Sequence, residues 1–308
     1  MGIVGLPNVG KSTLFNAITR AGAQAENYPF CTIEPNVGVV DVPDARLAVL
    51  HEMYQSKKTT PAAVRFVDIA GLVKGASKGE GLGNKFLEHI RQVDAIAHVV
   101  RCFEDADITH VEGAVDPIRD IGIITTELCL ADLETVEKRR EKLLRAMKSG
   151  SKEAKAEAAL LERVASSLSE GRPARQLDFS EEEAALLREL TLLTMKPTLY
   201  VANVAEDEAA TAEKENPFVQ RVKEYAAAEG AEVVAISAKV EAEIAELSGE
   251  EAKEFLAAIG LAESGLDRLI KKAFSLLNLM TFLTAGPDEC RAWTITRGTT
   301  APKAAGKI

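Results

Sequence analysis

Short apolar runs alternate with helical patterns along much of the chain. The runs are rich in β-branched residues and lie at residues 3–4, 37–40, 64–67, 95–100, 199–202 and 233–236. A segment with helical periodicity follows each of them. Because parallel strands require crossover connections, this alternation predicts an α/β fold with a mostly parallel sheet wrapped by helices.

The alternation stops between about residues 130 and 195, where the sequence is rich in Ala, Leu, Glu, Lys and Arg. Apolar stripes at helical spacing fall within 133–147 and 160–168, and Ser149-Gly150-Ser151 supplies a turn between them. This pattern predicts an antiparallel helical hairpin.

Two further segments complete the predicted organisation. Ser180 and Glu183 form a capping-box pattern that predicts the start of another helix. Residues 281–308 follow a last amphipathic helix and read as a separate small unit. About thirty residues are too few to bury a core alone, and the first strand is short, so we expect the natural chain to extend beyond both ends.

Composition narrows the class of protein. The 308 residues are 46% hydrophobic and 27% charged, as in soluble globular proteins. No run approaches the roughly 18 apolar residues of a membrane span. The net charge of -10 opposes general attraction to nucleic acid, and no DNA partner is expected. The four cysteines lack metal-ligand spacing, which predicts free thiols, no zinc site and a cytoplasmic location.

The strongest motif lies between the first strand and the first helix. Gly5-Leu6-Pro7-Asn8-Val9-Gly10-Lys11-Ser12 fits G-x-x-x-x-G-K-[ST], whose backbone N–H groups cradle phosphates. We predict that residues 8–13, from Asn8 and Val9 through Gly10, Lys11 and Ser12 to Thr13, bind nucleotide. Lys11 is expected to bridge the β- and γ-phosphates and to act in catalysis.

A second group of residues would complete a magnesium site. Asp68 ends the third predicted strand, where its carboxylate can reach Mg²⁺, and Ser12 and Thr32 are the other expected metal ligands. Thr32 could instead be an exposed loop hydroxyl. The N–H of Gly71 is expected to meet the γ-phosphate, and the glycine-rich residues 71–83 read as a nucleotide switch or as a plain flexible loop.

The residue that positions the attacking water is harder to assign. Leu72 stands where related enzymes carry a catalytic glutamine, and leucine has no polar atom to orient water. His110, in an acidic loop after the fourth strand, is the candidate for a catalytic role, with an ordinary surface histidine as the alternative. Asn8 has two readings, a ligand for K⁺ or a loop-stabilising hydrogen bond.

The base-recognition pattern departs from that of guanine-specific enzymes. The fifth main strand ends in Asn203-Val204-Ala205-Glu206 in place of N-K-x-D, and Ser237-Ala238-Lys239 follows the sixth strand. We predict that Asn203, Val204, Glu206, Ser237, Ala238 and Lys239 surround the base. Without the aspartate that accepts both guanine donors, selectivity for guanine is not expected.

These motifs together resemble the YchF-type Obg-like ATPase family. The resemblance rests on 5–12, 27–36, 68–83 and 203–206, including Leu72, and spans nearly the whole chain. It implies a Ras-like P-loop NTPase domain at 1–130 and 197–278, an inserted helical hairpin at 131–196, and the start of a truncated β-grasp (TGS) domain at 279–308. It also implies that this is a cytoplasmic protein that binds Mg²⁺-ATP, associates with ribosomes and acts in translation or stress regulation.

The resemblance leaves three functions to compare. The first is an ATP-hydrolysing switch that also accepts GTP. The second is a conventional GTP-selective regulator, and the third is a module that binds nucleotide without turnover.

One charged segment suggests a partner. Eight Lys or Arg residues against two Glu lie within 138–155 of an otherwise acidic chain, which predicts a contact with ribosomal RNA or else a solvated helical face.

Overall fold

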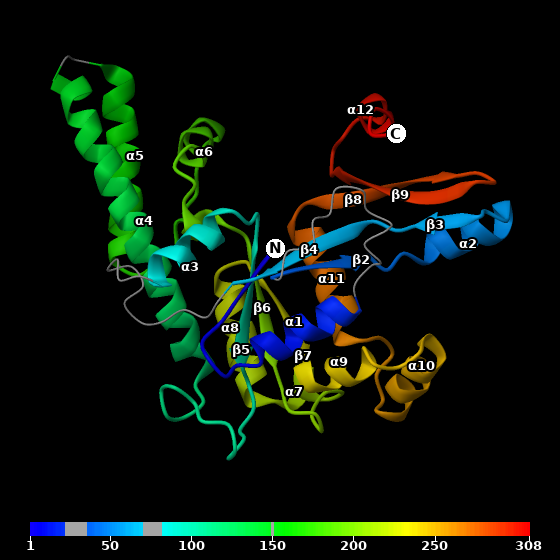
Figure 1. Cartoon of the computed structure of the whole chain (residues 1–308). Helices are drawn as coiled ribbons and strands as arrows, with labels where there is room; N and C mark the ends of the chain where they lie inside the picture. The colour runs from blue at the N-terminus through cyan, green and yellow to red at the C-terminus, as the bar shows by residue number, and fades with distance from the viewer. Residues whose placement is uncertain (22–35, 70–81, 149–150) are drawn as a thin grey trace.

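The structure is a computed structural model of the 308-residue chain, and it describes residues 1–21, 36–69, 82–148 and 151–308. Two sheets organise it (Figure 1). The larger has six strands in the order β2-β4-β1-β5-β6-β7. Its strands are β1 (Gly2–Val4), β2 (Val37–Asp41), β4 (Ala63–Asp68), β5 (Ile96–Arg101), β6 (Thr198–Asn203) and β7 (Glu232–Ile236).

All neighbouring strands of this sheet are parallel except β2, which runs antiparallel to β4. All six correspond to the apolar runs of the sequence, and the predicted α/β class is confirmed. β5 and β6 are buried along their whole lengths, as expected of central strands covered on both faces.

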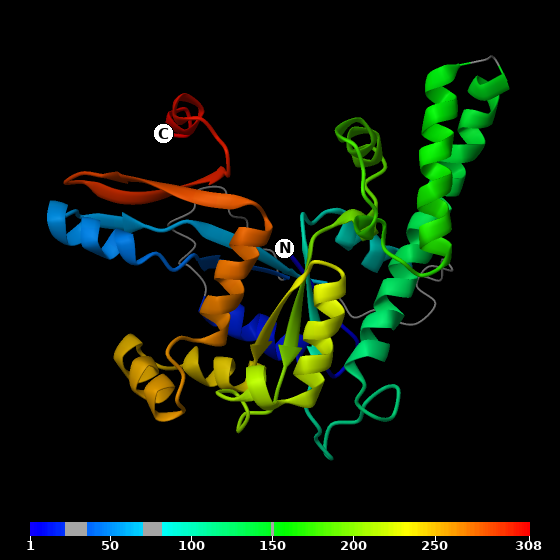
Figure 2. The same ribbon diagram turned by 180° about the vertical axis from the view of Figure 1, so that it is seen from behind.

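Helices cover both faces of the sheet (Figures 1 and 2). They are α1 (Lys11–Arg20), α3 (Leu82–Arg91), α8 (Pro217–Ala228), α9 (Ala238–Ile244) and α11 (Gly265–Leu276), with α7 (Ala212–Glu215) and α10 (Gly249–Ala258) at the periphery. One core joins the strands to α1, α3 and α11, and a second packs β5 and β6 against α8. No helix among the described residues is long and apolar enough to cross a membrane.

The helical hairpin projects from this body (Figure 1). It consists of α4 (Pro117–Lys148) and α5 (Lys152–Ser169), and Ser151 caps α5 through the N–H of Ala154. Residues 149 and 150 of the predicted turn lie outside the described residues. The apolar stripes of the two helices share a core of their own with Leu187 and Leu192. Two short 3-10 turns, η3 (Ala174–Gln176) and η4 (Leu193–Met195), and α6 (Glu181–Arg188) lead back to β6.

The capping box predicted for α6 is present, with Ser180 and Glu183 each bonding the other's backbone N–H. The start of the hairpin differs from the prediction, since residue 131 lies in the middle of α4. This helix begins at Pro117, beside the sheet, and continues without a break into the hairpin. The body that contains the main sheet and the hairpin therefore share one continuous helix.

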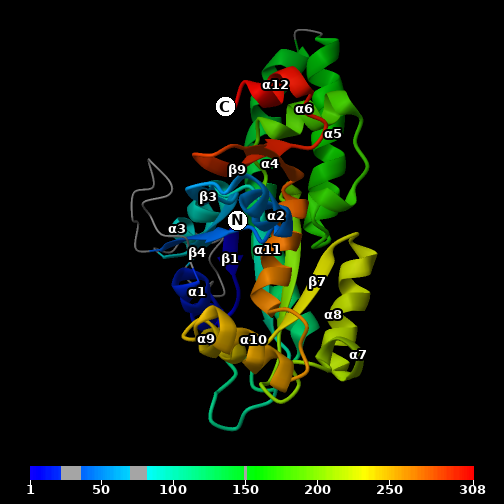
Figure 3. The ribbon, with the colours of Figure 1, turned by 90° about the vertical axis from the view of Figure 1, so that its right-hand side faces the viewer.

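The C-terminal residues form a second sheet with an N-terminal segment. β8 (Leu279–Ala285) and β9 (Glu289–Thr296) are antiparallel, and β3 (Lys58–Thr60) adds to β9 in parallel. The helix α2 (Ala45–Tyr54) contacts β8 and β9, and α12 (Ala301–Ala305) ends the chain (Figure 3). The hairpin of residues 281–308, predicted as a separate small unit, pairs and packs with residues 45–60.

Candidate nucleotide-binding site

The predicted phosphate-binding loop lies between β1 and α1, as its mechanism requires. Gly10 has φ +89°, and a Cβ there would lie 2.1 Å from the side-chain nitrogen of Asn203. Both observations restrict this position to glycine. The loop therefore curls tightly over the end of β6 before α1 begins at Lys11.

Asn203, at the end of β6, bridges two loops. Its side chain is only 4% exposed, its Nδ2 donates to the carbonyl of Val9 at 2.8 Å, and its Oδ1 accepts from the N–H of Ala238 at 2.9 Å. Both ends of the amide are thus engaged by backbone. The prediction that Asn203 surrounds the base is refined, because the structure shows it joining the phosphate loop to the start of α9.

Lys11 and Asp68 lie in direct contact as an ion pair, with side chains 10% and 21% exposed. They come from different elements, since Lys11 opens α1 and Asp68 ends β4, whose strand is the neighbour of β1. Ser12, next to Lys11, is exposed at the start of α1. A hydroxyl and a carboxylate are oxygen ligands of the kind that Mg²⁺ prefers, so these residues fit the expected metal.

Other predicted residues of this centre lie outside the described part of the chain. They are Thr32, Gly71 and Leu72, together with nearly all of the glycine-rich segment 71–83. Their assignments stay predictions.

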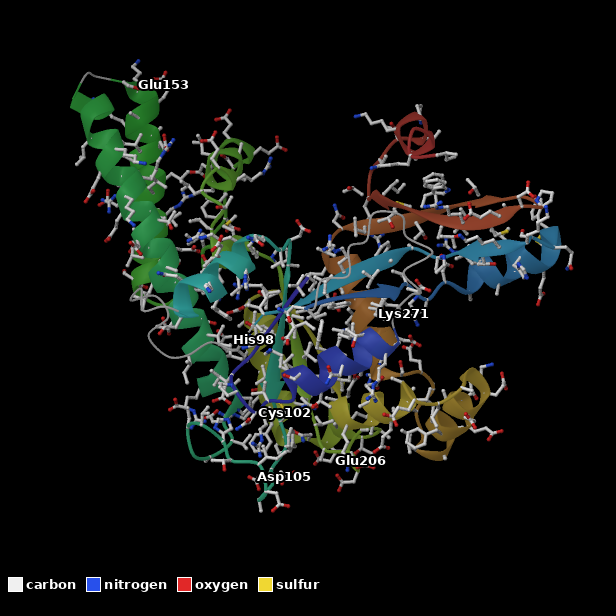
Figure 4. The ribbon with its side chains drawn as sticks, viewed as in Figure 1. His98, Cys102, Asp105, Glu153, Glu206 and Lys271 are labelled. Carbon is white, nitrogen blue, oxygen red and sulfur yellow. The ribbon has the colours of Figure 1, made fainter. Side chains whose placement is uncertain are left out.

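A cleft of about 530 Å³ adjoins the phosphate loop. Asn8, Gly10 and Thr13 line one side, and the remaining wall comes from Phe103, Glu104, Asp105, Ile108, Asn203–Glu206 and Ser237–Lys239. The structure therefore brings the predicted base-binding residues together. Figure 4 shows Asp105 and Glu206 at the end of the molecule opposite the helical hairpin.

Within this cleft the carboxylate of Glu206 is already paired. Lys239 Nζ lies 2.5 Å from Glu206 Oε2, and the hydrogen bond raises the pKa of Lys239. The two side chains are 70% and 47% exposed, so solvent screens the pair and its contribution to stability is small. Val204, in contrast, is buried in the core between β5, β6 and α8.

Two arginines that the sequence analysis did not single out hold the loop after β5. Buried Arg101 donates to the carbonyls of Phe103, Asp105 and Ile108, and its guanidinium stacks 4.6 Å from the Phe103 ring. Arg119, on α4, donates to the carbonyls of Glu112 and Ala114. The sequence contains one signal for Arg101, because a charged residue directly follows the apolar run 95–100. A cation buried at the end of such a strand needs several acceptors.

His110 lies in this loop and is buried, which corrects the reading as an ordinary surface histidine, while its catalytic role stays a prediction. Its side chain is 3% exposed, and Nε2 lies 2.8 Å from Asp120 Oδ2. The adjacent carbonyl of Thr109 accepts from Asn8 Nδ2 at 3.1 Å. The loop is therefore attached to the phosphate loop by Asn8, through the loop-stabilising bond expected as one of its two readings.

His98, the other buried histidine of the described residues, lies apart from the cleft in β5 (Figure 4). Burial, with a smaller effect from Arg175, lowers its pKa to about 3. It is a neutral core residue beside Tyr200.

Comparisons with known proteins agree with this geometry. Residues 1–131 match the family described as 50S ribosome-binding GTPase, and residues 279–308 match the YchF GTPase C-terminal family, described as a protein of unknown function (DUF933). The chain is similar to the ribosome-binding ATPase YchF of Bacillus subtilis (strain 168), with 59% identity over 307 residues that cover 100% of this chain and 84% of that protein.

The ribosome-binding ATPase YchF of Escherichia coli O157:H7 is 56% identical over 307 residues, which cover 100% of this chain and 84% of that protein. Among solved structures, the Schizosaccharomyces pombe YchF GTPase matches with a TM-score of 0.87 and 43% identity, covering 100% of this chain and 83% of that one.

The bridging geometry of Asn203 generates a prediction. Asn203→Ala leaves the buried Val9 carbonyl and Ala238 N–H without their partner, so we expect the free energy of unfolding to fall by roughly 1–3 kcal/mol. Affinities for ATP and GTP should fall by the same factor. Denaturant unfolding and calorimetric titration measure the two effects, with exposed Asn16→Ala on α1 as the control. A changed ratio of ATP to GTP affinity would instead assign base reading to Asn203.

Proposed function

The chain belongs to the YchF family of P-loop nucleoside triphosphatases, and on that premise we propose a Mg²⁺-dependent switch protein that hydrolyses ATP, accepts GTP and associates with the ribosome. We further propose a cytoplasmic role in translation or stress regulation. The observation that carries this proposal is the convergence of the phosphate loop, Asp68 and the 530 Å³ cleft at the carboxyl ends of the parallel strands. Ligands bind at this edge of open α/β sheets.

The metal assignment rests on Lys11, Ser12 and Asp68. Ser12 and Asp68 would hold Mg²⁺, which when bound neutralises charge on the β- and γ-phosphates. The contact between Lys11 and Asp68 supports this assignment, because one triphosphate could reach both side chains. Asn8 donates its side-chain nitrogen to Thr109, and the amide oxygen is the atom that would ligate a K⁺ ion as a second cation to test.

The proposed loss of guanine selectivity rests on two residues of the base cleft. Buried Val204 cannot present the cation of the N-K-x-D pattern, and the Glu206 carboxylate faces Lys239. The exposed ion pair is too weak to abolish guanine binding by itself. The loss of a bidentate contact to the base costs roughly 1–3 kcal/mol, by analogy with base readout elsewhere, and is the larger effect.

Two other functions each have one supporting observation. A conventional GTP-selective regulator is favoured by the GTPase family model that matches residues 1–131. A module that binds without turnover is favoured by the burial of His110 against Asp120.

We retain the division into a nucleotide-binding unit, the hairpin and the start of a TGS unit as a proposal, with α4 shared by the first two.

The proposed ribosome contact is the hairpin, whose tip lies at the opposite end of the molecule from the nucleotide cleft (Figures 1 and 4). Part of its basic charge is neutralised within the chain, because Lys138 pairs with Glu134, Arg139 with Glu157 and Arg140 with Glu162. Among the ion pairs of the described residues, none involves the exposed Lys142, Lys152 or Lys155. Those three lysines are therefore the better probes of an RNA contact.

We expect the triple charge reversal Lys142→Glu, Lys152→Glu and Lys155→Glu to weaken ribosome binding. If each lysine contacts a phosphate, the slope of log affinity against log salt should fall by up to about 3, while ATP affinity stays parental. Cosedimentation with ribosomes over a salt series measures the slope. Lys214→Glu, Lys303→Glu and Lys307→Glu make an equal charge change elsewhere and serve as the control. Parental binding by the hairpin variant would exclude this surface.

We expect His110→Ala to lower kcat for ATP by about 10²-fold or more, the usual scale for losing an acid-base or orienting group, with nucleotide affinity little changed. Single-turnover hydrolysis and a titration of ATP binding give the two values. Exposed His51→Ala on α2 is the matched control, and thermal unfolding of each variant verifies its fold. Turnover at the parental rate would show that another group positions the water.

A further inference from the structure

The hydrogen bonds around His110 define its tautomer. Nδ1 accepts from the backbone N–H of Glu112 at 3.1 Å, and a second donor, Arg119 Nη2, lies 3.4 Å from the same atom. A nitrogen that accepts carries no proton, so the ring proton of a neutral imidazole resides on Nε2. Nε2 therefore donates to Asp120 Oδ2 at 2.8 Å.

Asp120 is itself fixed in place. Its Oδ1 accepts from Arg119 Nε at 3.2 Å and from Nη2 at 3.0 Å, a two-pronged contact within the first turn of α4. Its side chain is 3% exposed. The other charged group near this carboxylate is Arg101, which is buried and committed to three loop carbonyls. Asp120 thus presents a fixed acceptor to His110.

This arrangement conflicts with direct action of His110 on a water at the phosphates. Both ring nitrogens are engaged inside the protein, so neither can accept a proton or orient a water without losing a partner. The loop itself is close to the site, since Thr109 accepts from Asn8 of the phosphate loop. His110 can act on such a water only if its ring separates from Asp120.

We propose that Asp120 is a positioning residue that holds His110 in a resting position, and that turnover requires the His110–Asp120 hydrogen bond to open. The proposal rests on the role proposed above for His110. Asp120 belongs to α4, the helix that continues into the projecting hairpin (Figure 1). Displacement of the first turn of α4 away from the loop is therefore the movement that releases His110.

The test uses Asp120→Asn in the full chain, because asparagine keeps the size of the side chain but removes the charge that strengthens the bond. Charge-assisted hydrogen bonds are roughly twice as strong as neutral ones. We expect single-turnover ATP hydrolysis to accelerate by about tenfold, with ATP affinity unchanged. An unchanged rate would overturn the proposal. A lower rate would also overturn it, because it would mean that Asp120 activates His110 in place.

Asp116→Asn is the matched control. Asp116 lies one turn earlier, accepts from the N–H groups of Ile118 and Arg119, and pairs with Arg221, so the variant removes the same charge at the same helix start without touching His110. It should hydrolyse ATP at the parental rate. Acceleration equal to that of Asp120→Asn would assign the effect to the helix end and contradict a specific role of Asp120.

Nitrogen-15 spectra of the imidazole report the geometry independently of activity. The parental protein should show His110 with a protonated Nε2 and a bare Nδ1, and Asp120→Asn should shift the ring toward averaged tautomers. A protonated Nδ1 in the parental protein would refute the arrangement. In the double variant with His110→Ala the acceleration should vanish, and its persistence would contradict the proposal. Parental turnover by His110→Ala alone, with the expected spectra, would refute the role of His110 proposed above.

Discussion

The site depends on the amide of Asn203, because one buried side chain joins two loops. Asn203 ends β6, and its side chain holds the phosphate loop through Val9 and the start of α9 through Ala238. The close approach is possible only because Gly10 lacks a Cβ. Burial of an amide costs little free energy when both its N–H and its oxygen are hydrogen-bonded. If one partner of a buried hydrogen bond is removed, the group left unpaired costs its full desolvation free energy. The phosphate and base sides of the cleft are thus fixed together.

The loop after β5 extends this rigidity to the remaining side of the cleft. Arg101 and Arg119 satisfy five carbonyls along residues 103–114, a segment without a strand or helix of its own. Their cations also offset the acidic side chains that crowd this loop. Since Arg119 and Asp120 both belong to α4, the loop is coupled to a helix that continues to the far end of the molecule. A nucleotide site and a partner surface can therefore communicate through one element.

Much of this architecture could be predicted from the sequence, because its signals are local. Apolar runs located all six strands of the main sheet, and Ser180 with Glu183 located a helix start. β3 was missed since Lys58-Thr59-Thr60 is short and polar, and its partner β9 lies about 230 residues away in the chain. Such a pairing comes from tertiary packing and leaves no periodicity. The contacts of the C-terminal hairpin with residues 45–60 were missed for the same reason.

The candidate site was predictable in its membership but less so in its roles. Motif spacing brought Lys11 and Asp68 together correctly, whereas Asn203 proved to be a bridge and His110 to be buried. Their roles depend on partners from other elements, Val9 and Ala238 for the first and Asp120 on α4 for the second. A sequence pattern gives residue types and their spacing, but it does not show which buried donors face which acceptors.

The account is tested most directly by calorimetric titration of the chain with ATP and with GTP at equal Mg²⁺. Because Val204 is buried and Glu206 faces Lys239, ATP should bind no more weakly than GTP. The double change Val204→Lys and Glu206→Asp, which restores the guanine-reading pattern, should move the preference toward GTP. Preference of the parental chain for GTP by a hundredfold would contradict the account and favour a conventional GTPase.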